Sequence, residues 1–489
     1  VQLNYFNSYG AFDAKNRAFY IQDDWNVTDQ MTLSLGVRRD DFKVFTADGN
    51  ILAEQSANYA PRVGFSYDLW GNGSGKLYGS YGIYYLPFAS NTAFRMTGYE
   101  LYFRELWNFS GFNGDGVPNL TAQLGPTGAY ASNCPFGLTP GSSGAGSSVC
   151  SVTGDGTVAP SEALISRNLK ATKEREFIIG YEHRLTDLWT LGINYTRRNL
   201  LRTAEDAAID AAVLDYCDNE GITGCSSTWT GFHQYVIINP GQDAEIVLDG
   251  LDGRTVTFTA EQLGYGDAER TYQAVEFTFE RAFDGKWSLK GSYSWSESEG
   301  NSEGFVQSDF GQADAGITQD FDQPTFVDGA YGLLPNHRRH RIKFWGNYAV
   351  TDRLVLGTNV QIASPRPLSC LGFHPQDNYN NFGNLYGAAS HYCGGVSSPR
   401  GTAQKTDWQK NVNVSVRYNI DIPSGQQVTL RGDVFNIFNF DGVTERNEVG
   451  DLRNPATFGD TTPVPSPNFG QATAYQEPRY VRIGADINF

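Results

Sequence analysis

Six cysteines and two histidines are the residues of this sequence whose types and spacing most readily suggest chemistry. The cysteines fall into three pairs of neighbours, Cys134 with Cys150, Cys217 with Cys225, and Cys370 with Cys393. His374 and His391 lie beside the third pair, so that two sulfurs and two imidazoles could bind zinc tetrahedrally. The other pairs have fewer histidines nearby, which favours disulfides in an oxidising compartment over metal. Six cysteines still allow other pairings.

A second cluster joins five basic side chains in one run, His337-Arg338-Arg339-His340-Arg341. Such a run could bind an anion. It stands at the start of a predicted strand, however, where a charged stretch at the rim or on the inner wall of a pore is the more common arrangement. We find no spacing of residues typical of a catalytic triad, and no acid–base pair. We therefore predict that the protein is not an enzyme and uses no cofactor.

The composition disfavours nucleic acid as a partner and favours strands. The chain has 489 residues and a net charge of -17, whereas binding to phosphates needs a basic face. It is rich in Tyr, Phe and Gly, with only two Met. The sequence has no apolar run of about 18 residues, but a strand of a membrane barrel shows only every second side chain to lipid. The first residues do not resemble a signal peptide, so we expect a mature chain or a fragment.

Strict alternation of apolar and polar residues is the strongest signal in the chain. It is clearest where apolar residues occupy positions 412, 414, 416, 418, 420 and 422 and polar residues occupy 411, 413, 415, 417, 419 and 421. This period of two predicts a strand with one apolar and one polar face. A second alternating segment begins at Val428, and only Pro423-Ser424-Gly425-Gln426 separates the two. The pattern predicts a tight β-hairpin.

Five more units of strand, short turn and strand recur, and the connections between the units are long. These connections fall at about residues 88–171, 202–268, 299–335, 364–405 and 440–477. Short periplasmic turns and long external loops are typical of an outer-membrane barrel, whereas such lengths are uncommon in a compact soluble domain. We predict an all-β fold over residues 1–489, a transmembrane antiparallel β-barrel in contact with lipid. Thirteen strands are visible, with residues 1–12 as the end of a fourteenth.

A soluble β-sandwich or propeller would also show alternation, and the polar face decides against it. That face is rich in Arg, Asn and Glu, which suits a water-filled lumen, and the sequence has no repeat of the length of a propeller blade. A barrel sets one further condition. Its last strand, which here ends at Phe489, must pair with the first so that no edge meets lipid.

Four phrases of the sequence carry a family resemblance. They are YIQDDW at residues 20–25, APRVGFSY at 60–67, NHRRHR at 336–341 and DVFNIFN at 433–439. In this order they resemble the strand motifs of TonB-dependent outer-membrane receptors, in particular their Oar-like branch. The resemblance implies a barrel of about 22 strands with a plug domain. Roughly eight or nine strands, the plug and a TonB-contacting segment would then lie upstream of this sequence.

The resemblance also implies a function, namely energy-coupled uptake of an unidentified ligand through a plugged barrel in the outer membrane of a Gram-negative bacterium. TonB would be contacted through the upstream region, and a surface lipoprotein is a further candidate partner. Two other functions stay open. One is a passive outer-membrane channel, and the other is a structural or adhesive surface protein whose loops bind partners.

Two groups of residues acquire roles from the resemblance. The last strand would be an assembly signal for the barrel-insertion machinery, with Val481, Ile483, Ile487 and Phe489 as its residues. Five arginines would face the pore, namely Arg38, Arg62, Arg417, Arg431 and Arg482. Each of these arginines is equally well explained as a solvated, ion-paired residue of the lumen wall.

Overall fold

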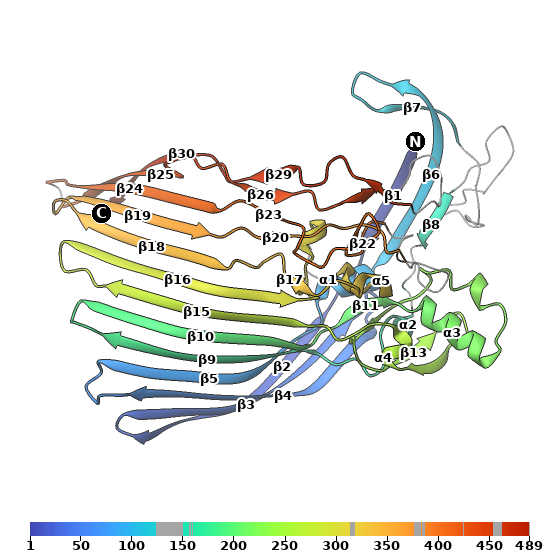
Figure 1. Cartoon of the computed structure of the whole chain (residues 1–489), viewed down its shortest axis with the longest axis horizontal. Helices are drawn as coiled ribbons and strands as arrows, with labels where there is room; N and C mark the ends of the chain where they lie inside the picture. Colours follow the sequence, from blue (N-terminus) through green and yellow to red (C-terminus); the bar gives the residue numbers. More distant parts are fainter. Residues whose placement is uncertain are drawn as a thin grey trace.

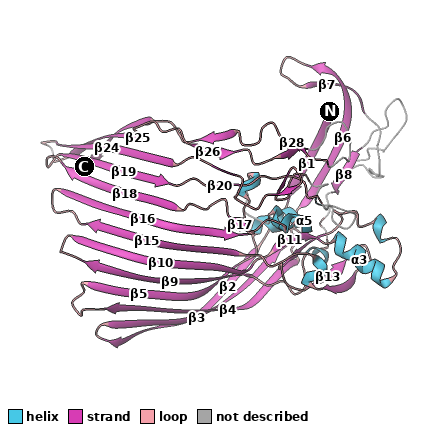
Figure 2. Ribbon diagram, viewed as in Figure 1, coloured by secondary structure: helices cyan, strands magenta, loops and turns pink. Residues whose placement is uncertain are grey.

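The structure is a computed structural model that describes residues 1–123, 150–155, 158, 160–312, 318–375, 383, 387–423, 425–452 and 462–488. One antiparallel sheet makes up most of it, and its strands run side by side along the molecule (Figure 1). Tight turns join the strands at one end, where the C-terminus also lies. The long connections and the helices gather at the opposite end (Figure 2). Among the described residues, no helix is both long and apolar enough to cross a membrane.

In the described part of the chain, thirteen strands follow one another in this sheet as an up-and-down meander. They are β2 (Ala14–Thr28), β3 (Met31–Phe45), β4 (Ile51–Asp68), β5 (Gly75–Leu86), β9 (Thr172–Arg184), β10 (Trp189–Arg202), β15 (Arg270–Arg281), β16 (Trp287–Gly300), β18 (His340–Ala349), β19 (Leu354–Ala363), β24 (Gln409–Asp421), β25 (Gln427–Phe435) and β30 (Tyr480–Asn488). The two-residue strand β17 (Gly332–Leu333) adds to the edge of the β16 ladder. We call this sheet the wall.

The two faces of the wall differ in polarity because side chains alternate along every strand. In β24, Val414 pairs with Thr358 of β19 and Val434 of β25, whereas Asn413 on the other face pairs with Asn359. The apolar face leaves large side chains between 40% and 47% exposed, including Leu35, Ile193, Phe277, Ile342 and Leu430. Exposed apolar side chains spread over a whole sheet face suit lipid rather than water.

The two outermost strands of the wall each have one edge without a partner strand. Among the described residues, β2 pairs only with β3, and β30 pairs only with β25. Among the residues that the structure describes, the expected pairing of the last strand with the first is therefore not formed. All 15 residues of β2 are exposed, and Ile483 of β30 is 85% exposed. In the part of the chain that the structure describes, the strands form an open wall, not a closed barrel.

The first strand lies outside the wall, so the expectation that residues 1–12 end a fourteenth barrel strand is wrong. Strand β1 (Gln2–Tyr9) pairs along its whole length with β6 (Tyr99–Phe112). Strand β6 also pairs with β7 (Pro118–Gln123) and β8 (Cys150–Asp155), and this second sheet projects from the end of the wall (Figure 1). The reason is that β6, which falls inside a predicted loop, offers a row of backbone donors and acceptors to β1.

The other long connections are folded as well. Their short strands are β11 (Glu205–Ala208), β12 (Tyr235–Ile238), β13 (Ala244–Leu248), β14 (Arg254–Phe258), β20 (Pro367–Leu368), β21 (Tyr392–Cys393), β22 (Val396–Ser397), β23 (Gln404–Lys405), β26 (Val443–Arg446), β27 (Asp451–Leu452), β28 (Val464–Pro465) and β29 (Ala472–Tyr475). Their helices are α1 (Ser90–Thr97), α2 (Ser161–Leu164), α3 (Asp210–Glu220), η2 (Cys225–Ser227), α4 (Ala260–Leu263), η3 (Ser308–Phe310), η4 (Gln319–Phe321) and α5 (Pro324–Val327).

Buried apolar side chains are concentrated in these connections. The larger buried cluster is centred on Trp229 and Phe258 of the connection 202–268, and Phe321 of the next connection packs against it. A smaller cluster joins the far end of β3 to α1, where Val44 and Ala93 are both buried. The connections thus have a core of their own, whereas the apolar face of the wall is left to lipid.

The two-faced wall predicts opposite outcomes for one substitution at neighbouring positions. Val414→Arg places a charge on the apolar face near the middle of β24, and we expect a cost of about 2–4 kcal/mol in lipid. Ser415→Arg, on the polar face beside Asp433, is the matched control and should cost little. Urea unfolding of the full-length protein in lipid vesicles measures both. Equal destabilisation by the two substitutions would contradict the assignment of the faces.

Candidate functional site

The polar face of the wall is lined by ion pairs between neighbouring strands or their ends. They include Lys76 with Glu182 at 2.9 Å, Lys290 with Glu280 at 3.0 Å, Arg482 with Asp433 at 2.7 Å, and the pairs Arg198–Glu176 and Arg431–Asp486. Exposed pairs of this kind add little stability individually. They give the polar face of the wall a hydrated surface, on which an oppositely charged neighbour neutralises most charged side chains.

The five arginines proposed to face a pore all lie on this polar face, but they differ in their partners. Arg38 lies 2.8 Å from Asp40, and the Arg62 guanidinium lies over the Tyr84 ring, 4.7 Å from its centroid. Arg431 and Arg482 belong to the ion pairs above. Arg417 is exposed, and its strand neighbour in register is Arg431, another cation.

Arg38 and Arg62 also line one hollow of about 490 Å³ on β2 to β5. Tyr84 and Gln22 contribute to the same hollow. Arg417, Arg431 and Arg482 are not among its lining residues, so the structure does not gather the five arginines into one site.

The basic run His337–Arg341 divides into residues with and without partners. Three members are engaged: Ser298 N–H donates to His337 Nδ1 at 3.1 Å, the Tyr293 hydroxyl lies 2.9 Å from His340 Nδ1, and Arg339 pairs with Glu297 at 2.7 Å. Burial lowers the pKa of His337 to about 4, which keeps the ring neutral and able to accept. The remaining two members, Arg338 and Arg341, form no ion pair with any residue that the structure describes.

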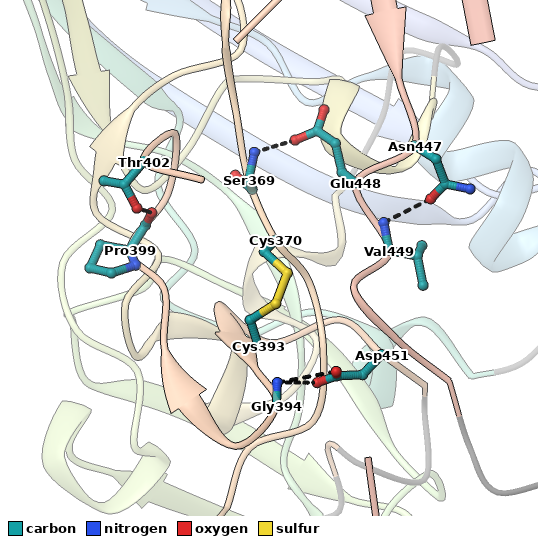
Figure 3. Close-up of a disulfide and its surroundings, with 10 residues drawn as sticks. All are labelled: Ser369, Cys370, Cys393, Gly394, Pro399, Thr402, Asn447, Glu448, Val449 and Asp451. Atoms are coloured by element: carbon teal, nitrogen blue, oxygen red, sulfur yellow. Dashed lines mark hydrogen bonds between the residues drawn. A yellow bond between two sulfur atoms is a disulfide. The ribbon is translucent and has the colours of Figure 1, made fainter. Parts of the chain in front are cut away.

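Two of the three predicted disulfides are formed in the structure. Cys217 is bonded to Cys225, and Cys370 to Cys393. Figure 3 shows the second bond, with Gly394 N–H donating to the carboxylate of Asp451 beside it. The third prediction, Cys134 with Cys150, involves Cys134, which lies outside the described residues, so it stays a prediction.

The disulfide between Cys370 and Cys393 decides against the zinc alternative. Both sulfurs are bonded to each other and cannot act as thiolate ligands. His374 Nε2 instead lies 3.0 Å from Asp328 Oδ2. His391 is buried, and burial lowers its pKa well below the usual value. The disulfide and the contact between His374 and Asp328 therefore stabilise the fold of the connection 364–405.

The side chain of one buried arginine forms ion pairs between two connections. The sequence did not predict this contact. Arg400 is fully buried, and its Nη1 lies 3.0 Å from Asp309 Oδ2 while Nη2 bonds to Asp320. Its Nε–H donates to the Ala330 carbonyl at 2.7 Å. Removing one partner of such a pair typically destabilises a protein by about 3–5 kcal/mol. Arg400 thus holds the connection 364–405 against 299–335.

A second buried arginine continues this network to the last connection. Arg366 is 4% exposed, and its Nη2 lies 3.0 Å from Glu448 Oε1 and also bonds to Glu445. Glu448 Oε2 accepts from Ser369 N–H at 2.5 Å, as Figure 3 shows. Three connections are therefore joined by two arginines. The partners are about 80 residues apart in sequence, so no local pattern could reveal them.

Two adjacent carboxyl groups of β11 lie among the connections, where Glu205 is buried and Asp206 is half-buried. Glu205 is 0% exposed, and burial raises its pKa well above the usual value, although Thr318 N–H donates to it at 2.9 Å. Burial also raises the pKa of Asp206 to about 7, with repulsion from Glu205 as the second cause. Both groups therefore hold a proton to higher pH in the folded chain than in the unfolded chain.

The predicted assembly signal lies on an exposed strand. Val481, Ile483 and Ile487 of β30 are 62%, 85% and 54% exposed and share the apolar face. Phe489 lies outside the described residues. The role of these residues in assembly stays a prediction.

Comparison with known proteins places the chain in a family. A family model described as an outer membrane beta barrel domain matches residues 46–369. The chain belongs to this outer-membrane β-barrel family. The predicted fold class and the predicted location, the outer membrane of a Gram-negative bacterium, are both confirmed. Its apolar face is accordingly the face toward lipid.

One curated relative is a transporter. The TonB-dependent transporter Oar of Myxococcus xanthus is 24% identical to this outer-membrane barrel chain over 518 residues, covering 96% of this chain and 42% of that protein. The chain thus spans about two fifths of the length of this relative. The match confirms the resemblance to the Oar-like branch of TonB-dependent receptors.

Solved structures show only a loose likeness. The outer membrane transporter YddB of Escherichia coli aligns with a TM-score of 0.49 and 11% identity, over 96% of this chain and 45% of that one. The siderophore receptor PiuA of Acinetobacter baumannii aligns with a TM-score of 0.47 and 12% identity, over 97% and 43%. With TM-scores below 0.5, these likenesses bear on neither ligand nor mechanism.

The raised pKa values of Glu205 and Asp206 predict that the local stability of the connection 202–268 depends on pH. Because folding raises their pKa values, their stabilisation is full below about pH 4 and is lost as the pH rises through about 7. We expect the free energy of local opening at residues 205–208 to fall by at least about 1 kcal/mol between pH 5 and pH 8. Hydrogen exchange of these amides, corrected for the intrinsic rate at each pH, measures it.

Two variants test this prediction with the same Glu→Gln substitution, one at a buried position and one at an exposed position. Glu205→Gln should reduce the pH dependence, because an amide mimics the protonated carboxyl group and no longer repels Asp206, whose burial remains. Glu220→Gln, at an exposed position of α3, should leave it unchanged. A protein whose local opening does not vary between pH 5 and pH 8 would contradict the protonation of these groups.

Proposed function

We propose that this chain is the carboxy-terminal part of the barrel of a TonB-dependent transporter, which takes up a ligand through a plugged pore with energy supplied through TonB. The match to the TonB-dependent transporter Oar along 96% of the chain supports the assignment. Because the chain spans less than half of that relative, the plug and the TonB-contacting segment are proposed for sequence upstream of residue 1.

The open wall is the observation that carries this proposal. A passive channel made from these strands alone would need β2 and β30 to pair with each other, and among the described residues they do not. Backbone groups at such edges cannot remain unpaired in lipid. Strands from outside this sequence are therefore proposed to pair with both edges and to complete a barrel of about 22 strands.

The polarity of the wall and the layer of connections support a transport role. Under this proposal the five arginines discussed above, from Arg38 to Arg482, face the lumen. The ion pairs of the polar face keep the surface of the lumen hydrated. The disulfide-bonded connections lie outside the cell, which is an oxidising environment. There they would meet a ligand before it enters the barrel.

Partners follow from the same assignment. The exposed apolar side chains of β30 suit a contact with the barrel-insertion machinery before the barrel closes, with Val481, Ile483 and Ile487 as the contacting residues. TonB is proposed to act through the upstream region. A surface lipoprotein is a further proposed partner for the external connections.

The proposal is tested by measuring which compounds cells remove from their medium. Three strains of the source bacterium are compared: one intact, one without the gene for this protein, and one without TonB. We expect at least one compound to be depleted only by the intact strain, because uptake needs both the barrel and its energy supply. Mass spectrometry of the spent medium provides the readout.

Each alternative function has its own outcome in this experiment. If a compound disappears whenever the barrel is present, with or without TonB, the protein is a passive channel. If no compound depends on the barrel, but cells without it lose surface adhesion, the protein is an anchor for binding loops. Either result contradicts energy-coupled uptake.

A further inference from the structure

A hollow of about 550 Å³ lies where the polar face of β18, β19 and β24 meets the connections. Its volume is within the range typical of sites for small ligands. Four cations line it, namely Arg338, Arg341, Lys343 and Lys410, together with amide side chains that include Gln361 and Asn411. None of the described residues that line this hollow is Asp or Glu. It is therefore a positively charged recess in a chain whose net charge is -17.

The four cations of this recess form no ion pair in the described part of the chain, and the Lys410 ammonium lies 5.6 Å from the centroid of the Phe440 ring. Arg341 is exposed and Lys343 is half-buried, and neither side chain forms an ion pair there. Arg338 donates only to the carbonyl of its neighbour His337, at 3.0 Å. Elsewhere on the polar face most cations have a carboxylate within 3.0 Å or in direct contact, as Lys76 and Arg482 do. Arg62 and Arg417 depart from this pattern singly, whereas Arg338, Arg341 and Lys343 do so together around one hollow.

The surroundings of the recess increase its positive potential. Burial lowers the pKa of Arg338 to about 10, and repulsion from Arg366 and Arg341 contributes. Glu445 is the carboxylate that acts on Arg338, but it is already bonded to Arg366. A bound anion would relieve this repulsion, whereas a neutral ligand would not.

We propose that this recess binds a small polyanion, a compound that bears two or more carboxylate or phosphate groups. An arginine guanidinium binds such groups with two parallel hydrogen bonds, and a lysine ammonium adds a point charge. Arg341 and Lys343 are two residues apart on one face of β18, so their Cα atoms are about 7 Å apart. That spacing suits two oxyanion groups of one ligand, and the amides of Gln361 and Asn411 can donate further hydrogen bonds.

This inference rests on the proposed function, because it names the class of ligand that the transporter would take up. It also gives the basic run of the sequence two separate roles. His337, Arg339 and His340 hold β18 against its neighbours through the contacts described above. Arg338 and Arg341 are left to meet a ligand, and Lys343 extends their row along the strand.

Binding is measured on the full-length protein in detergent by isothermal titration calorimetry, with tripolyphosphate and citrate as polyanions and raffinose as a neutral control. We expect saturable binding of at least one polyanion and none of raffinose. Arg341→Gln and Lys343→Gln should each weaken binding on the order of tenfold, as expected for a hydrogen bond to a charged group. Arg417→Gln removes the same charge from the same face outside the recess and should leave the affinity unchanged.

A second variant keeps all four cations and lowers the net charge of the recess by adding a carboxylate. Gln361→Glu places a carboxylate inside the recess, and it should weaken polyanion binding as strongly as Lys343→Gln does. Preference for tripolyphosphate over citrate, or the reverse, distinguishes phosphate from carboxylate as the bound group.

Three results would overturn the inference. The first is an absence of saturable binding to both polyanions. The second is equal weakening by Arg417→Gln, which would indicate unspecific attraction. The third is a lowered melting temperature of the ligand-free variants with no change in affinity, because the cations would then hold an acidic segment of the protein outside this sequence. Binding in detergent needs no energy supply, so failed uptake in cells would leave this result standing.

Discussion

Backbone hydrogen bonding between neighbouring strands is the constraint on which the rest of this structure depends. In lipid, a backbone amide or carbonyl group without a hydrogen-bond partner costs roughly several kcal/mol of free energy. A membrane-spanning strand therefore needs a neighbouring strand on both sides. Within the described residues, every inner strand of the meander from β2 to β30 pairs with a strand on each side. The outermost strands, β2 and β30, each have one edge without a partner strand there. The same ladder fixes which side chains face lipid, because a shift of one residue would exchange the two faces. Val414 and Asn413 show how sharply adjacent residues differ.

The connections are governed by different physics from the wall. They pack apolar side chains such as Trp229 and Phe258 into a core, and they bury the charged side chains of Arg400 and Arg366 with carboxylates from other connections. A buried ion pair of this kind specifies which segments meet more than it adds to stability. On the wall, by contrast, charges are exposed and most are paired with a neighbour. The recess with Arg341 stands at the boundary of the two regions, where neither pattern supplies a carboxylate.

Period-two alternation was enough to predict the wall, because one side of each strand faces lipid and the other faces water. It could not predict the pairing of β1 with β6, since both strands lie outside the wall and their pairing joins residues that are about 90 to 104 positions apart. Nor could it find Arg400, whose partners are 80 and 91 residues away. Two disulfides were within reach because the paired cysteines are only 8 and 23 residues apart. The basic run from His337 was visible in the sequence, but only the structure separated its engaged members from Arg338 and Arg341.

The central claim is that this chain is one arc of a larger barrel whose remaining strands are encoded outside these 489 residues. Electron cryomicroscopy of the full-length protein, purified from outer-membrane fractions, tests the claim directly by identifying the neighbours of β2 and β30. We expect each edge to pair with a strand from outside this sequence, in a barrel of about 22 strands around a folded plug. A barrel closed by direct pairing of β2 with β30, with an empty lumen, would contradict it.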